Sequence, residues 1–242
     1  MDLRKAFIYS FEDEDWVSKL GIGLAISLVP ILNFAWIGYI IDIMRNVIKG
    51  EPKVLPGWDN LGEKFMDGLM LYLASLVYAL PALLLIGIPM VIMIVPALLS
   101  SSGNMQNVAN ALFAAGGFVY LCLSCILLLY GLALSVVYPA IFVEYARQGT
   151  FVSCFQFKAI FTLIQNNVGP FFTAWGIYLA TAIGSGIAIG IVGGILGLIP
   201  CLGGIVAFII GLALGVYTSL VYAHLFGQFS IIEAGSTPPA TA

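Results

Sequence analysis

Charged residues are scarce in this chain. Of its 242 residues only 9% are Asp, Glu, Lys or Arg, whereas 61% are hydrophobic. A soluble domain carries about 25% charged residues, and one hydrophobic core could not bury so much apolar surface. The small net charge of −3 also argues against nucleic acid as a partner, because a nucleic-acid-binding surface is basic. A lipid bilayer fits this composition, so membrane lipids are the expected surroundings.

Residues that carry catalysis or bind metals are equally few. The chain has one histidine, His224, so no site that needs several histidines can be assembled. His224 lies near the end of an apolar run, where a histidine usually hydrogen-bonds a neighbour; it remains a weak candidate for ligating a haem or chlorophyll. The four cysteines lie in or beside apolar runs and are expected to be small buried hydrophobes. We therefore predict no catalytic residue, no metal site and no cofactor.

Long apolar runs dominate what is present. They cover residues 20–44, 68–99, 110–143 and 168–232. A helix needs about 20 residues to cross about 30 Å of hydrocarbon, and the last run is long enough for two helices separated at "GLIPCLGG" (197–204). The sequence predicts an all-α, polytopic helical membrane protein with five or six membrane segments and interfacial amphipathic helices. Residues 1–229 form its single membrane domain, and residues 230–242 form a short polar tail.

The first apolar run has two interpretations. It is either one helix kinked at Pro30 or a short hairpin that turns at "VPILN" (29–33). A single crossing would divide the nine basic residues between the two sides of the membrane, whereas a hairpin leaves all nine in the cytoplasm. The hairpin is favoured, with six segments and both termini cytoplasmic, and five segments are the alternative.

Two further features concern packing inside the membrane. Asp42 is the acid that lies well inside an apolar run, and Arg45, three residues on, is expected to pair with it, as Arg147 is with Glu144. An ion or proton role for Asp42 is the alternative. Glycines recur every four residues at Gly186, Gly190 and Gly194. Packing within the last hairpin is the favoured role of this face, and self-association or contact with other membrane subunits is the alternative.

Two polar segments interrupt the apolar runs. Residues 149–169 predict an amphipathic helix that lies in the cytoplasmic interface. The other segment is "GEPKVLPGWDNLGEKFMDGL" (50–69), which we call the island. Its prolines exclude helix before Trp58, which suits the headgroup layer, and Asp59 or Asn60 can cap a helix that begins at Leu61. The candidate functional or partner surface comprises Trp58, Asp59, Asp42, Asn33 and Gln228.

Three stretches together resemble one known family. They are "YSFEDEDWVSKLGIG" (9–23), residues 28–69 including the island, and "AHLFGQ" (223–228). They are similar to the prokaryotic multi-pass membrane proteins grouped as domain of unknown function 4013. The chain has Gly57 where that pattern would place an acid before the tryptophan. The resemblance implies a prokaryotic inner or plasma membrane and brings no established activity.

Three functions are compatible with these features. A non-catalytic structural or accessory subunit, or scaffold, of a larger membrane assembly is favoured by the glycine face and the island. A small transporter or channel for ions or small solutes is the alternative, motivated by Asp42, Asn33 and the proline-broken helices. A pigment-binding or lipid-active protein, which would need His224 or the island, is the least favoured.

Overall fold

The computed structural model describes residues 1–99, 106–199, 202–233 and 235. Its described residues form helices α1 to α8 and two 3-10 turns, with no strand among them. The order is α1 (Leu3–Ile8), η1 (Tyr9–Phe11), α2 (Trp16–Ser27), α3 (Asn33–Lys49), α4 (Leu61–Leu99), α5 (Gln106–Gln148), η3 (Phe151–Phe155), α6 (Phe157–Asn166), α7 (Val168–Leu196) and α8 (Leu202–Glu233). The predicted all-α class is confirmed.

Four of the described helices are long and apolar enough to cross a membrane. Their apolar spans are Leu61–Gly87, Gly116–Gln148, Val168–Leu196 and Leu202–Ile232. The first apolar run divides into α2 and α3, because α2 ends at Ser27 and α3 begins at Asn33. The interpretation of this run as a single helix kinked at Pro30 is therefore wrong. At 12 residues α2 reaches only about 18 Å, so the predicted total of five or six crossing segments is not confirmed.

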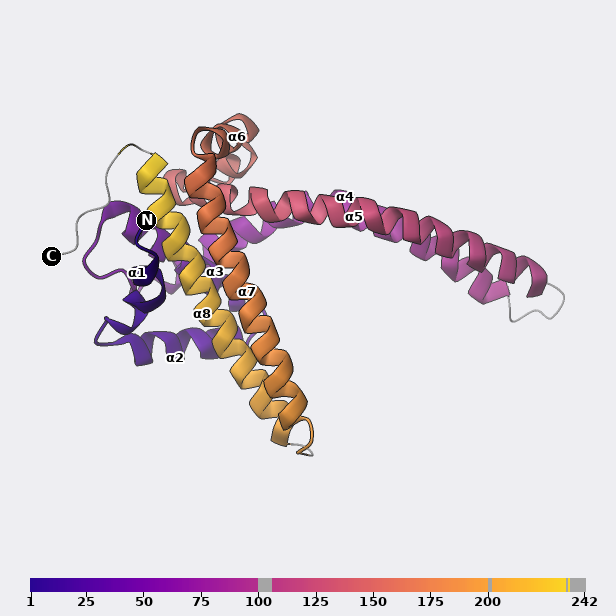
Figure 1. Cartoon of the computed structure of the whole chain (residues 1–242), viewed down its shortest axis with the longest axis horizontal. Coiled ribbons are helices and arrows are strands. Elements are labelled where there is room, and N and C mark those ends of the chain that lie inside the picture. The colour runs from indigo at the N-terminus through magenta and orange to yellow at the C-terminus, as the bar shows by residue number, and fades with distance from the viewer. Residues whose placement is uncertain (100–105, 200–201, 234, 236–242) are drawn as a thin grey trace. The chain divides into compact units, whose positions relative to one another are not determined.

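The chain forms two compact units. The first comprises residues 1–72 with 139–242, and the second comprises residues 73–138. In the first unit α7 and α8 form an antiparallel hairpin, and α3 packs along α8 (Figure 1). A methyl group at Gly203 would lie 1.6 Å from the Leu196 carbonyl oxygen, so the two helices meet backbone to backbone beside their turn. Residues 200 and 201, the centre of the predicted break, lie outside the described residues.

The core of the first unit lies where α3 meets the second half of α8. A methyl group at Gly227 on α8 would lie 2.8 Å from the Val47 side chain on α3, so only glycine allows the two helices to pack this closely. The N-terminal segment docks on the same region, since the Tyr9 hydroxyl donates to the Leu220 carbonyl at 3.1 Å. The largest fully buried side chains are aromatic and aliphatic, among them Tyr39, Ile43, Met44, Phe226 and Phe229. Helix α8 continues to Glu233, so the predicted tail of residues 230–242 begins inside it.

The second unit comprises the C-terminal part of α4 and the N-terminal part of α5. Tyrosines join its helices: the Tyr130 hydroxyl donates to the Tyr78 carbonyl at 2.6 Å, and the Tyr138 hydroxyl donates to the Ser75 carbonyl at 3.4 Å. Cys122 and Cys125 are exposed on α5, so the expectation that they are buried is wrong. Such exposure suits a surface that faces lipid.

The predicted amphipathic segment forms η3 and α6. Ile160 and Leu163 are buried, whereas Phe157 and Phe161 are more than half exposed on the same helix. Gly149, with φ of +66°, lets the chain turn sharply after α5, and Gly50, with φ of +69°, ends α3 in the same way. Cys154 is buried here, and burial raises the pKa of its thiol to about 11, so it is a neutral packing group at pH 7.

Candidate functional site

Four charged side chains meet where α3 crosses the start of α4. Asp42 and Arg45 come from α3, and Lys64 and Asp67 come from α4. Arg45 Nη1 lies 3.1 Å from Asp42 Oδ1 and also contacts Asp67 Oδ2, while Lys64 Nζ lies 2.7 Å from Asp42 Oδ2. The Tyr145 hydroxyl on α5 donates to Asp67 Oδ1 at 2.8 Å. These five residues, which we call the charged cluster, tie three helices together.

The charged cluster is balanced and largely shielded from water. It holds two carboxylates and two cations, and the Lys64 side chain is only 5% exposed. Burial alone would lower the pKa of Arg45, but its hydrogen bond to Asp67 and the charges of Asp67 and Asp42 outweigh this and raise it. Arg45 therefore stays charged at every accessible pH. The predicted pairing of Asp42 with Arg45 is confirmed.

The pairing determines what the charged cluster can do. Both oxygens of Asp42 accept from a cation, and both oxygens of Asp67 are also engaged. Both carboxylates are therefore occupied by contacts within the chain. Removing one member of such a buried pair is costly, since the partner charge is left uncompensated. The geometry of the charged cluster is that of a structural contact that holds helices together.

Two glycines bring α3 and α4 close enough for these contacts. A methyl group at Gly38 would lie 1.8 Å from the Lys64 carbonyl oxygen, and one at Gly68 would lie 1.7 Å from the Phe34 carbonyl oxygen. Real side chains do not approach so closely, so both positions require glycine. The backbones of α3 and α4 therefore touch beside the charged cluster. This contact fixes the distance that the charged side chains span between the two helices.

The island is held to the helices by a cluster of three aromatic rings. The Tyr39 ring packs nearly parallel to Trp58, at 4.5 Å, and to Trp36, at 5.2 Å, and the two tryptophan rings also contact each other at 6.4 Å. Trp58 Nε1 donates to the Lys19 carbonyl at 2.9 Å, and Lys19 Nζ donates to the Leu55 carbonyl at 3.0 Å. The island and α2 therefore hold each other in place. Trp58 works as an internal anchor, while its neighbour Asp59 is exposed.

His224 and Gln228 anchor the N-terminus. Gln228 Oε1 accepts from the Asp2 amide at 2.7 Å, and its Nε2 donates to the Asp2 carbonyl at 3.0 Å. His224 Nδ1 lies 3.0 Å from the same Nε2, and the His224 ring stacks on Tyr9 at 4.4 Å. Both side chains are at most 5% exposed. The hydrogen-bonding interpretation of His224 matches this environment, and Gln228 offers no outward surface.

The remaining predicted residues are separate. Asn33 is exposed at the start of α3 and lines a pocket with Trp36, away from the charged cluster. The second predicted pair does not form. Arg147 Nε and Nη2 donate to the Oγ and carbonyl of Ser230, at 2.8 and 2.7 Å, and Glu144 accepts from Gln148.

The contacts of several members of the charged cluster were not predicted from the sequence. Lys64, Asp67 and Tyr145 are distant from Asp42 along the chain, so helical spacing gives no sign of their contact. Gly38 is isolated, with no other glycine at a spacing of four. The available signal was the density of charged residues in the island. These include Lys64 and Asp67, but the sequence does not show which residues they contact.

The fold and this site define a polytopic, all-helical protein whose long helices can cross a membrane and whose charged cluster joins three of its helices. The chain belongs to the family described as "Protein of unknown function (DUF4013)", which matches residues 22–198. The resemblance found in the sequence is thereby confirmed. No curated protein and no solved structure matches the chain.

Proposed function

We propose that this chain is a non-catalytic integral membrane protein that serves as a structural or accessory subunit, or scaffold, of a larger membrane assembly. Its charged cluster supports this role, because those side chains hold helices together and none is left over to bind a solute. A transporter built on Asp42 is less well supported for the same reason.

One observation carries the proposal: among the described residues, nothing packs against the glycine face of α7. A methyl group at Gly186, Gly190 or Gly194 would meet no atom within 4 Å. Packing within the last hairpin, the favoured interpretation of these glycines, is therefore wrong. By contrast, glycines that serve packing inside the chain, such as Gly38 and Gly68, lie against backbone.

The neighbours of these glycines complete the α7 face. Ile187, Ile191 and Ile195 each follow one of the glycines and are 58%, 60% and 62% exposed. Apolar exposure alone says nothing in a bilayer, since lipid is as apolar as isoleucine. Glycines at a spacing of four are different, because they make a shallow groove in which another helix can approach closely, and β-branched neighbours form its walls. The α7 face fits a second membrane helix, from another copy or another subunit.

The proposed topology follows from the fold and the basic residues. The four long helices cross the membrane, and α2 with α3 forms a short hairpin that returns to the side on which it began. The termini and all nine basic residues then lie in the cytoplasm. The membrane is a prokaryotic inner or plasma membrane.

The test is the size of the protein taken gently from its native membrane. We expect the wild type in mild detergent to migrate as a species well above the 25.9 kDa of one chain. Gly190→Leu fills the groove and should shift the protein to the single chain. Gly176→Leu is the matched control, because Gly176 is also an α7 glycine with open space beside it and lies outside the repeat. Migration of the wild type as a lone chain would contradict the proposal.

A further inference from the structure

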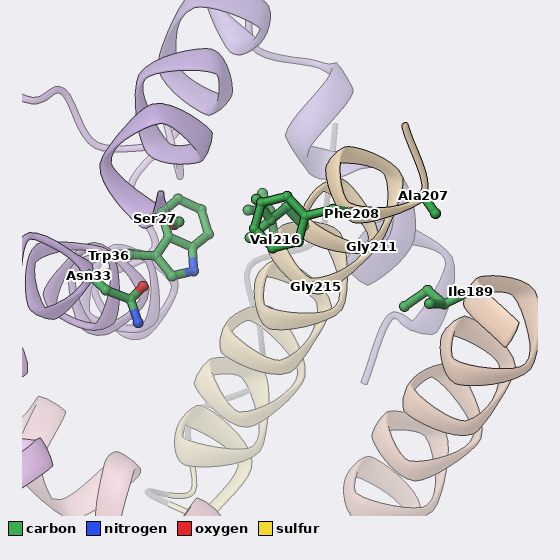
Figure 2. Close-up of a pocket in the computed structure, with 10 residues that line it drawn as sticks. Ser27, Asn33, Trp36, Ile189, Ala207, Phe208, Gly211, Gly215 and Val216 are labelled. Atoms are coloured by element: carbon green, nitrogen blue, oxygen red, sulfur yellow. The ribbon is translucent and has the colours of Figure 1, made fainter. Parts of the chain in front are cut away.

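A pocket of about 530 Å³ lies within the first unit, between the tip of the α2–α3 pair and the α7–α8 hairpin. Figure 2 shows Asn33 and Trp36 on one side of it and residues of α8 on the other, with Ile189 of α7 nearby. Its volume lies in the range of roughly 300–1,000 Å³ that small-molecule sites occupy. Most of its lining is apolar, including Phe208 and Val216.

Two glycines keep the α8 wall of the pocket hollow. Gly211 and Gly215 lie one turn apart and both line it. A methyl group at Gly215 would meet no atom within 4 Å, and one at Gly211 would meet only Ile189 Cγ2 at 3.9 Å. No side chain of the described residues fills this space, so an apolar ligand can lie along the helix.

The opposite wall carries the polar groups. The Trp36 indole donates to Ser219 Oγ at 3.2 Å, and the Ser27 hydroxyl donates to the Gly23 carbonyl at 2.8 Å. The Asn33 side chain is exposed, and within the described part of the chain it makes no hydrogen bond. Asn33 therefore offers two N–H donors and a carbonyl beside an otherwise apolar pocket.

The depth of the pocket rests on the proposed topology, in which Leu202 lies at the outer edge of the hydrocarbon. Ser219, to which Trp36 is bonded, lies about 26 Å along α8 from its first residue, Leu202. The hydrocarbon is about 30 Å thick, so the polar wall lies near the membrane interface on the side of the charged cluster. From Val216 to Ala207 the α8 wall runs about 14 Å toward the bilayer centre, which is close to the thickness of one leaflet.

We propose that this pocket binds one hydrocarbon chain of a phospholipid from that leaflet, which is the cytoplasmic one in the proposed topology. The chain lies in the hollow made by Gly211 and Gly215. The Asn33 amide donates to an oxygen that joins the chain to glycerol. A free fatty acid fits less well, because its carboxylate would need a cation and no lysine or arginine is among the described residues that line the pocket.

The test measures retention of lipid by native mass spectrometry, with dioleoyl phosphatidylglycerol titrated onto the delipidated full chain. We expect the wild type to hold one lipid tightly. Gly215→Leu should weaken this binding by about tenfold or more, the factor for loss of about two buried CH₂ groups. Gly204→Leu is the control, since Gly204 lies on the same helix with open space beside it and does not line the pocket.

The other results overturn the proposal. Equal retention by all three proteins would place the lipid elsewhere, and a wild type that holds none would exclude the site. Oleic acid that displaces the phospholipid at equal concentration would exclude a phospholipid as the occupant. If Gly215→Leu does not fold, as judged by its circular dichroism, Asn33→Ala decides: we expect about two- to tenfold weaker binding, the effect of one hydrogen bond, and unchanged binding refutes the site.

Discussion

Replacing Lys64 with methionine tests whether the charged cluster holds α3 and α4 together. Methionine keeps most of the unbranched side chain of Lys64 and removes the ammonium that lies 2.7 Å from Asp42 Oδ2. Breaking a fully buried ion pair costs about 3–5 kcal/mol. Asp42 is 24% exposed and keeps Arg45 at 3.1 Å, so solvent and the second cation reduce this cost. We expect Lys64→Met to lower the free energy of unfolding by about 2–3 kcal/mol.

The double-mutant cycle with Asp42→Asn isolates the interaction. Because each single substitution leaves a partner charge behind, the double variant should be less destabilised than the sum, with a coupling of about 1–2 kcal/mol. The assay is reversible unfolding by dodecyl sulfate in mixed micelles, followed by circular dichroism. Lys158→Met, at an exposed position on α6, is the control and should change little. A Lys64→Met protein within about 0.5 kcal/mol of wild type, or purely additive effects, would show that the charged cluster does not hold α3 and α4 together.

Three further predictions use the same unfolding assay. Gly38→Ala should lower the free energy of unfolding by about 3 kcal/mol, because its methyl group would lie 1.8 Å from the Lys64 carbonyl oxygen. Gly176→Ala, whose methyl group would lie in open space, should not destabilise the protein. Equal effects of the two substitutions would contradict the close crossing of α3 and α4. Tyr39→Phe should be neutral or slightly stabilising, because the Tyr39 hydroxyl is buried without a hydrogen bond among the described residues; a loss above about 1 kcal/mol would reveal a missing partner. Burial alone would raise the pKa of Asp13, but the hydrogen bond from Lys19 lowers that pKa below its usual value. Ionised Asp13 therefore stabilises the fold above about pH 4, and this stabilisation is lost as the pH falls through the lowered pKa. The stability difference between wild type and Asp13→Asn should therefore be constant from about pH 7 to 5 and shrink below about pH 4; a difference that grows on acidification would contradict this.

Local patterns predicted the parts of the fold that depend on neighbouring residues. Composition indicated the helical class, and the spacing of Asp42 and Arg45 predicted their ion pair, since both follow from the geometry of one helix. The start of α4 at Leu61 was also expected, because the prolines of the island exclude helix before it. Such features need no knowledge of which helices touch.

What depends on how helices meet could not be predicted. The period of Gly186, Gly190 and Gly194 shows that they share a face, but it does not say whether that face is turned inward; α8 packs elsewhere on α7 and leaves the face open. Likewise, Tyr145 reaches Asp67 only because α5 crosses beside α4. The predicted number of crossing segments is not confirmed for a related reason: hydropathy measures apolar length, and the first run divides its length between α2 and α3.

Photo-cross-linking in native membranes tests whether the α7 glycine face binds another membrane helix. A photoreactive amino acid replaces Ile191, which is 60% exposed beside Gly190, or Ile205 on α8, which is 59% exposed and serves as the control. We expect a protein adduct of discrete mass from position 191 and lipid adducts alone from position 205. Lipid adducts alone from both positions would contradict it.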